Sequence, residues 1–446
     1  MTNITFRTSE GTILGWQDKN VIRATGIPYA VAGRYEKPQE MKGVGGEEPY
    51  VATKWSPACP QSFSPILKEV FGMDMADELS LDENCQHLSI TLPNSESPLN
   101  DKPVMVWIHG GSYVTGAGDM TAYDPALLVS EQELIVVNVS YRLGLFGFLG
   151  GYNDIPANLG LLDIIAALRW IKKHIAAFGG DPENITLFGQ SAGGDAIAHL
   201  MLAEDIEGLF RNVIIQSAPL GIRRGKASLT ELLIKKAASM PKDASSQTLL
   251  AAQDTMLFSM RQVGLKGGMP FGVQYGYEPL PKEEAAEAVW KERAERWNVL
   301  IGWTSRETAL FAPYIGLTKR LMHLPIVGKK VLEWLIRKTT DKVYRDSGHA
   351  LAQLIAGGGK SVYAYEIDWG ANENPFKAAH VIDIPLLFGN EEFWKDAVFC
   401  KGISSEELRA AGRRLRAIWA SFARTGSLDE QKRIPDLITY QRVRAS

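Results

Sequence analysis

The sequence predicts an α/β fold, in which a mostly parallel central sheet carries helices on both faces and a helical cap. Between residues 104 and 216, short apolar runs rich in β-branched side chains alternate with helical patterns, as in repeated strand–helix–strand units. Residues 220–296 are rich in Ala, Lys and Glu and show no strand pattern, which predicts helices covering the site end of the sheet. No linker-like or low-complexity stretch divides the 446 residues. We therefore expect one domain over 1–446, although the length alone would allow two or three.

The expected elements follow in chain order. A hairpin is predicted around Gly11, from residues 4–6 and 12–16, and residues 21–26 form a further strand. A long helix is predicted over 161–178, and a closing helix over 405–425. The remaining expected strands are residues 104–108, 134–139, 185–188, 213–216, 298–302 and 361–367. Cap insertions are expected at about 220–296 and 310–345, the second containing a basic amphipathic segment over 317–345.

The segment Gly189-Gln190-Ser191-Ala192-Gly193 is a G-x-S-x-G pattern between a predicted strand and a predicted helix. A sharp turn at this place would expose the Ser191 hydroxyl, and the helix N-terminus beneath it would favour a developing oxyanion. Glycines two residues to either side permit the turn without a Cβ clash. A chance match in a loop is the alternative, and the strand–helix context argues against it. Ser191 is thus the candidate nucleophile.

A second glycine-containing turn, His109-Gly110-Gly111-Ser112-Tyr113, follows the predicted strand 104–108. Acyl transfer needs backbone N–H groups aimed at a tetrahedral oxyanion, and a glycine pair lets the backbone approach closely. These two turns, with the segments 138–144, 158–163 and 178–182, closely resemble the type-B carboxylesterase family, the cholinesterase-like branch of the α/β-hydrolases. The likeness is dense from about Gly26 to Ser217, and the bacterial para-nitrobenzyl esterases are a similar type.

The resemblance implies an α/β-hydrolase fold and a serine ester hydrolase. It implies backbone N–H donors from Gly111, Ser112 and Ala192, with Ser112 standing where the family commonly has a third glycine. His380 is the expected base, because a small residue precedes it and a Pro and a Phe-Gly follow, as in the family's histidine segment. The acid is expected at Glu307, where Arg-Glu-Thr replaces the family's usual Asp-Glu-Gly.

Asp383 and Asp368 are the fallback acids. Cys59 and Cys85 stand where secreted relatives form a small-loop disulfide, whereas Cys400 has no evident partner. In a reducing cytosol the pair would be expected to stay as thiols.

Composition limits the classes of molecule that this chain is expected to bind. A net charge of −3 gives no reason to expect nucleic acid or an anionic membrane. No basic region followed by an apolar core opens the sequence, and no apolar run approaches the ~20 residues that span a bilayer, so a cytoplasmic location without stable membrane association is expected. The cysteines lack Cys-x-x-Cys spacing, and Gly357-Gly358-Gly359-Lys360-Ser361 lacks the strand-to-helix context of a phosphate loop. We expect no metal and no cofactor.

The expected activity is hydrolysis of small-molecule esters with uncharged, short to medium acyl groups, through an acyl-enzyme. A carbamate or amide hydrolase on the same residues is the alternative, since one oxyanion site serves all three reactions. A non-catalytic, cholinesterase-like interaction protein is disfavoured because Ser191, Glu307 and His380 are all retained. The oligomeric state stays open.

Overall fold

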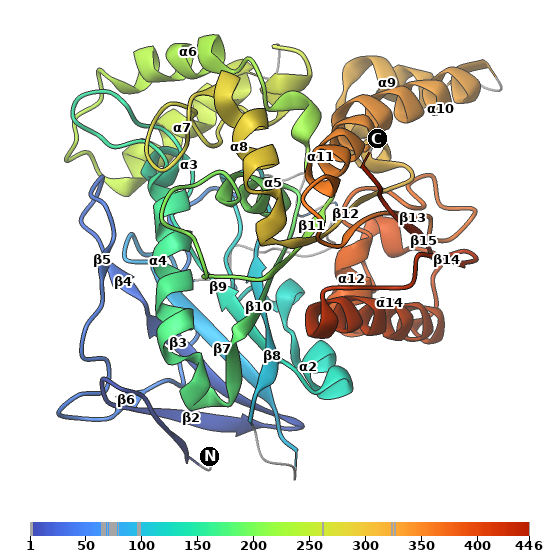
Figure 1. Cartoon of the computed structure of the whole chain (residues 1–446). Coiled ribbons are helices and arrows are strands. Elements are labelled where there is room, and N and C mark those ends of the chain that lie inside the picture. The colour runs from blue at the N-terminus through green and yellow to red at the C-terminus, as the bar shows by residue number, and fades with distance from the viewer. Residues whose placement is uncertain are drawn as a thin grey trace.

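The central feature of the computed structural model is one large twisted sheet with helices on both faces (Figure 1). The structure describes residues 3–63, 68, 70, 78, 80–95, 100–260, 263–322, 324 and 327–445. Within these residues the sheet has 13 strands, in the order β1-β2-β3-β7-β9-β8-β10-β11-β12-β13-β15-β14, with β6 (Tyr50–Val51) beside β2. The expected α/β fold with a mainly parallel centre is confirmed.

The parallel centre of the sheet contains every strand expected there from the apolar runs. It runs through β9, β8, β10, β11, β12 and β13 by consecutive parallel pairs. The bounds are β8 (Lys102–Ile108), β9 (Ile135–Val139), β10 (Gly180–Gln190), β11 (Asn212–Gln216), β12 (Asn298–Thr304) and β13 (Val362–Ile367). These strands are buried because helices cover both faces, which is why their sequences are continuously apolar.

Only some strands of the antiparallel flanks were predicted. The hairpin β1 (Asn3–Arg7) and β2 (Thr12–Asp18) and the strand β3 (Val21–Pro28) are confirmed. Four strands of this sheet were not predicted: the two-residue β6, β7 (His87–Pro93), β14 (Gln431–Ile434) and β15 (Ile438–Arg442). The short separate pair β4 (Ala30–Val31) and β5 (Gln39–Glu40) was not predicted either. The segment 405–425 is therefore not the last element, because β14 and β15 follow it and pair with β13.

The helices form two layers with separate hydrophobic cores. On one face, α4 (Leu159–His174) and α5 (Ala192–Leu200) pack with Val104, Val106 and Ile108 of β8. On the other, α2 (Ala126–Gln132), α12 (Asp383–Phe388) and α14 (Ser405–Thr425) pack with Met105 and Trp107. Alternate residues of one strand thus point into opposite cores.

Helices dominate the two segments expected to form the cap, and they lie at the top of the view in Figure 1. The first segment contains α6 (Ala227–Ala237), α7 (Ser246–Met260) and α8 (Ala286–Glu292). The second contains η8 (Glu307–Tyr314), α9 (Gly316–Met322), α10 (Val327–Thr340) and the π-helical turn η9 (Asp341–Arg345), which continues into α11 (Asp346–Ala356).

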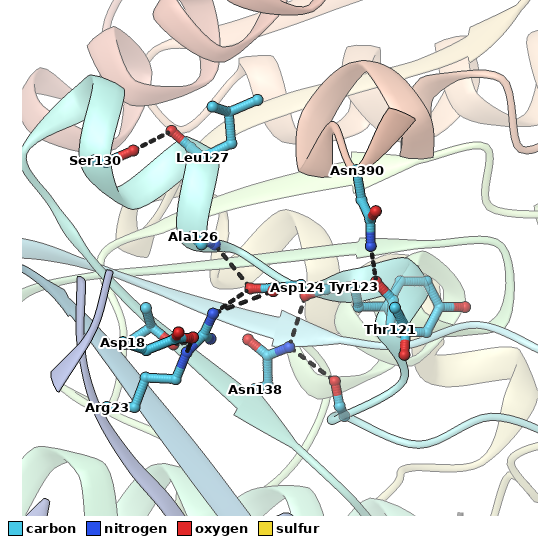
Figure 2. Close-up of polar contacts among 12 residues, drawn as sticks. Asp18, Arg23, Thr121, Tyr123, Asp124, Ala126, Leu127, Ser130, Asn138 and Asn390 are labelled. Carbon is cyan, nitrogen blue, oxygen red and sulfur yellow. Dashed lines mark hydrogen bonds and ion pairs between the residues drawn. The ribbon is translucent and has the colours of Figure 1, made fainter. Parts of the chain in front are cut away.

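A buried arginine fastens the antiparallel flank to the loop that follows the glycine turn (Figure 2). Arg23 donates from Nε to Asp18 Oδ2 at 2.7 Å and from Nη2 to Asp124 Oδ1 at 2.8 Å. Asn138 of β9 donates to the Tyr123 carbonyl at 3.0 Å. Charge-assisted bonds of this kind are strong when buried, so the loop around residues 121–124 has a fixed position on the sheet.

Candidate active site

Ser191 lies at the tight turn between β10 and α5, as the G-x-S-x-G pattern predicts. Its backbone has φ +57° and ψ −122°, a conformation rarely seen in residues other than glycine. A Cβ placed on Gly193 would lie 1.9 Å from the Ile108 carbonyl oxygen, and one on Gly189 would lie 2.6 Å from the same atom. Both glycines are needed because the turn presses against the end of β8. The Ser191 side chain is partly exposed.

His380 and Glu307 form a buried pair. The Nδ1–H of His380 donates to Glu307 Oε2 at 2.5 Å, and the second carboxylate oxygen accepts from the Thr304 backbone N–H at 2.8 Å. The His380 backbone N–H also donates to the Glu307 carbonyl at 3.2 Å, so main chain and side chain hold the two residues together. Val381, next in the chain, has φ +80°, which is strained for a β-branched residue.

The fallback acids lie elsewhere. Asp383 Oδ2 accepts from the Gln216 side chain at 2.6 Å, while Asp368 accepts from the Ser305 hydroxyl at 2.7 Å. Burial, partly offset by the Gln216 hydrogen bond, raises the pKa of Asp383 from 3.8 to about 6. Neither carboxylate bonds to His380 within the described residues.

Three backbone N–H groups near the candidate nucleophile have no hydrogen-bond acceptor among the described residues. Within the described residues, the N–H groups of Gly111, Ser112 and Ala192 donate no hydrogen bond. Ala192 is the first residue of α5, so its N–H has no partner in the helix. Gly111 has φ +110° and Ser112 has φ +57°, which turns this loop sharply at the end of β8. Unpaired donors at such a turn are suited to an oxyanion.

The side chain of Gln190 contacts the imidazole directly, a contact that was not predicted. The Gln190 amide nitrogen lies 3.2 Å from His380 Nε2. Among the described residues, no hydrogen bond joins His380 Nε2 to Ser191 Oγ. Because Nδ1 donates to Glu307, Nε2 is the acceptor in the neutral ring.

A second buried network supports the glycine turn from below. Tyr113 donates its hydroxyl to Asp195 Oδ2 at 2.5 Å, and Arg223 donates to the same oxygen. Neutral His199, one turn further along α5, accepts at Nε2 from the Tyr275 hydroxyl at 2.7 Å. Burial lowers the pKa of His199 to about 3, which keeps this ring uncharged. The network joins residues that sequence spacing does not relate.

The rim of the site comes partly from the second cap segment. The rings of Phe311 and Tyr344 lie with their centroids 5.7 Å and 5.4 Å from that of His380.

Cys59 and Cys85 are both buried and unbridged in this structure, as is Cys400. Cys59 and Cys85 are therefore free thiols in this structure, at the positions where secreted relatives form a disulfide.

Comparison with known proteins assigns this arrangement to a family. The model of the Carboxylesterase family matches residues 2–325. The chain belongs to the carboxylesterase family. It is 34% identical, over 91% of its length and 89% of the relative's, to a probable N-octanoylanthranilate hydrolase of Rhodococcus erythropolis. It is 29% identical to the para-nitrobenzyl esterase of Bacillus subtilis, over 96% of this chain and 91% of that protein.

Solved structures give the same assignment. A thermophilic PNB esterase superposes on this carboxylesterase with a TM-score of 0.81 at 28% identity, covering 99% of this chain and 98% of that one. The expected α/β-hydrolase fold and the expected class, a serine ester hydrolase, are both confirmed. In the described part of the chain, no helix combines the length and the hydropathy that crossing a bilayer requires.

Proposed function

We propose that this carboxylesterase hydrolyses its substrates through Ser191, His380 and Glu307, with the backbone N–H groups of Gly111, Ser112 and Ala192 as the oxyanion site. The observation that carries the proposal is the buried contact of 2.5 Å between His380 Nδ1 and Glu307 Oε2. It fixes the tautomer that leaves Nε2 as a base on the side of the imidazole where Gln190, the neighbour of Ser191, lies.

The chemistry follows from these positions. Ser191 Oγ attacks the carbonyl carbon while Nε2 of His380 takes the hydroxyl proton, and Glu307 stabilises the resulting imidazolium. The tetrahedral oxyanion accepts hydrogen bonds from the three free N–H groups. His380 then gives its proton to the leaving alcohol, and a water molecule attacks the acyl-enzyme by the same steps. Before attack, the Gln190 amide must give up Nε2 to the serine hydroxyl.

Two variants and one label test the assignment. Ser191→Ala is expected to lower kcat by at least ~10⁴-fold, and Glu307→Gln by roughly 10³–10⁴-fold, with the fold retained. An organophosphate should label one residue per chain, identified by peptide mass spectrometry as Ser191. Labelling of another serine, or near-normal turnover by Glu307→Gln, would contradict the assignment.

The substrates are proposed to be uncharged esters with short to medium acyl chains. Cholinesterases hold a quaternary ammonium over a tryptophan in the loop that corresponds to residues 59–85, and this loop contains no tryptophan. Its aromatic residues are Phe63 and Phe71, and the second, with the acidic residues Glu69, Asp74 and Asp77, lies outside the described residues. Neutral Gln190 also removes a negative charge from the site.

A choline ester and its uncharged carbon isostere therefore provide the substrate test. We expect kcat/KM for the isostere to equal or exceed that for the choline ester at physiological salt. A choline preference of about tenfold, or about 1.4 kcal/mol of transition-state binding, would contradict this substrate class.

Amide hydrolysis is a second candidate, favoured by the relative from Rhodococcus erythropolis, whose name specifies an N-acyl bond. The cap segments 220–296 and 310–345 would set the preference by shaping the acyl and leaving-group sides. A panel of matched ester, carbamate and anilide chromogens, assayed with Ser191→Ala as the blank, decides among the three. An anilide kcat/KM within about tenfold of the ester value would favour the amidase, because intrinsic reactivity strongly favours esters.

A further inference from the structure

The second cap segment presents a surface that the hydrolytic site does not use. Helix α10 exposes Val327, Val331 and Trp334, which have i, i+4, i+7 spacing and therefore share one side of the helix. The opposite side of α10 is covered by the protein, where Gly328, Ile336 and Thr340 are buried. This helix thus has two apolar sides, one packed and one open to solvent.

Further exposed apolar residues lie on and beside the neighbouring helix α9. Leu317 of α9 and Ile315, just before it, are exposed, with Leu317 at 63% and Val327 of α10 at 70%. Helices η8, α9 and α10 pack against one another, and Figure 1 shows α9 and α10 projecting at one end of the molecule. We call the side chains of Ile315, Leu317, Leu324, Val327, Val331 and Trp334 the apolar rim. An exposed cluster of this kind marks an interaction surface.

The segment that carries most of the apolar rim is rich in basic residues. Residues 316–345 contain eight Lys or Arg and two acidic residues, a net charge of +6 in a chain whose total is −3. Both acids, Glu333 and Asp341, are already paired with arginines. Lys329, Lys330 and Arg337 form no ion pair within the described residues and line a hollow of about 560 Å³ beside Trp334.

We infer that this surface adsorbs reversibly to a lipid surface bearing anionic headgroups, with the apolar rim entering the headgroup boundary and the lysines and Arg337 contacting phosphate. Basic side chains around exposed Trp, Leu and Val are the features by which amphipathic helices bind such surfaces. A second copy of the chain fits less well, because a two-fold contact would set the unpaired Lys329, Lys330 and Arg337 of one copy against those of the other. The inference goes beyond the proposed hydrolysis and does not depend on which residues form the triad.

The apolar rim lies on helices that follow directly from the proposed hydrolytic site, so adsorption would bring that site to the lipid. Helix η8 carries Phe311, whose ring lies 5.7 Å from the His380 imidazole, and leads directly into α9. A chain adsorbed through α9 and α10 would therefore hold Phe311, and with it the His380 side of the proposed site, close to the lipid. Amphiphilic esters dissolved in that lipid would reach the site without passing through bulk water.

Vesicle sedimentation with the full chain, in the absence of substrate, tests the inference. We expect binding to phosphatidylcholine vesicles containing about 30 mol% phosphatidylglycerol, and at least tenfold weaker binding to pure phosphatidylcholine. Raising salt from about 0.1 M to about 0.5 M should weaken the anionic binding, because screening acts on exposed charges. Glycerol phosphate in solution should not compete, since it offers no apolar phase.

Two matched pairs of variants assign the contact. Lys329→Glu/Lys330→Glu and Trp334→Glu should each lower the partition coefficient at least tenfold. The controls, Lys235→Glu/Lys236→Glu and Leu232→Glu, place the same changes on exposed residues of α6 and should have little effect. All four variants should keep the wild-type kcat/KM for a water-soluble ester, which separates this result from any failure of the hydrolytic assignment.

Three results would overturn the inference. One is absence of binding to either vesicle at low salt. Another is equal loss in the α6 controls, which would indicate a non-specific charge effect. The last is a concentration-dependent dimer that Trp334→Glu abolishes, since a second copy would then occupy the surface.

Discussion

At the scale of single residues, the decisive contacts are those that position unpaired backbone donors. The loop carrying Gly111 and Ser112 contributes two N–H groups, and helix α5 contributes the third at Ala192. The Tyr113 hydroxyl bonds to Asp195, so one hydrogen bond of 2.5 Å connects the loop to the helix. Arg223 forms an ion pair with the same carboxylate, which compensates the negative charge of Asp195 in the protein interior. The spacing of the proposed oxyanion donors therefore depends on the hydrogen bond between Tyr113 and Asp195.

Tyr113→Phe is expected to lower kcat by about 10–100-fold with KM nearly unchanged, because misplaced donors weaken only the transition state. The inhibition constant of a trifluoromethyl ketone, which forms a tetrahedral adduct, should rise in parallel. Tyr275→Phe is the matched control, since it removes a hydroxyl that bonds to His199 in the same network and does not touch the loop. Equal effects of both changes on kcat would mean that the network serves stability alone.

The same scale shows where sequence reasoning stops. Ser191 could be identified because the turn chemistry is local: five consecutive residues between a strand and a helix. The contact between Gln190 and His380 joins residues 190 positions apart, and the network of Tyr113, Asp195 and Arg223 joins a loop, a helix and a cap segment. Such distances are set by the packing of whole elements, and nothing in the residue spacing encodes them.

At the scale of elements, Asp383 shows how one buried carboxylate couples three of them. It begins α12, bonds to Gln216 at the end of β11, and Gln216 in turn accepts from Trp419 of α14 at 3.2 Å. Burial raises the pKa of Asp383 to about 6. The folded state therefore holds this proton more tightly than the unfolded chain, and the group's contribution to stability is lost as pH rises from about 4 to about 6.

Asp383→Asn should remove that loss, because the amide stays neutral and its oxygen can still accept from Gln216. The free energy of unfolding of the variant, relative to the wild type, is expected to increase by up to about 3 kcal/mol between pH 4 and pH 7. Urea titrations across this range measure it, with Asp368→Asn, an exposed carboxylate, as the control. A difference that does not change with pH would show that Asp383 titrates normally.

Two of the missed strands, β14 and β15, share a physical cause. Strand β14 is exposed or half-buried throughout, and β15 alternates buried Ile438 and Tyr440 with exposed neighbours. Strands of this antiparallel flank lack the continuous apolar sequence of the parallel centre, so they give a weak signal. Strand β7 is different: residues 87–93 alternate apolar and hydroxyl side chains, which is a strand pattern that was available in the sequence.

At the scale of the whole molecule, a buried ion pair connects regions that are distant in the sequence. Arg142, after β9, forms two bonds with Asp163 of α4, from Nε at 2.8 Å and from Nη2 at 2.7 Å. Nη1 of the same guanidinium donates to the Glu36 carbonyl oxygen, in the N-terminal part of the chain, at 2.7 Å. Asp163 is fully buried, so a loss of its partner would leave an uncompensated charge in the core.

Arg142→Met is expected to cost about 3–5 kcal/mol of unfolding free energy, and Arg142→Met/Asp163→Leu to recover most of that loss. Chemical denaturation measures both. The exposed pair of Lys172 and Glu183 provides the contrast, because Lys172→Met should change stability by less than about 1 kcal/mol. If the double variant proved as unstable as the single one, packing of the arginine stem would outweigh its charge.

The contact of the serine turn with the end of β8 also constrains how this protein can change over generations. At Gly189 and Gly193 the backbone of one segment touches the Ile108 carbonyl of another, so no larger residue can be accommodated without moving the sheet or the helix. In a library containing every single substitution, both positions should tolerate almost nothing, and rescue by a second mutation should be rare because the obstacle is main chain. Gly43, Gly208 and Gly264, with open space around the position of a Cβ, should accept residues that adopt a positive φ, asparagine first. The glycines of this chain thus divide into positions that selection cannot alter and positions that it can.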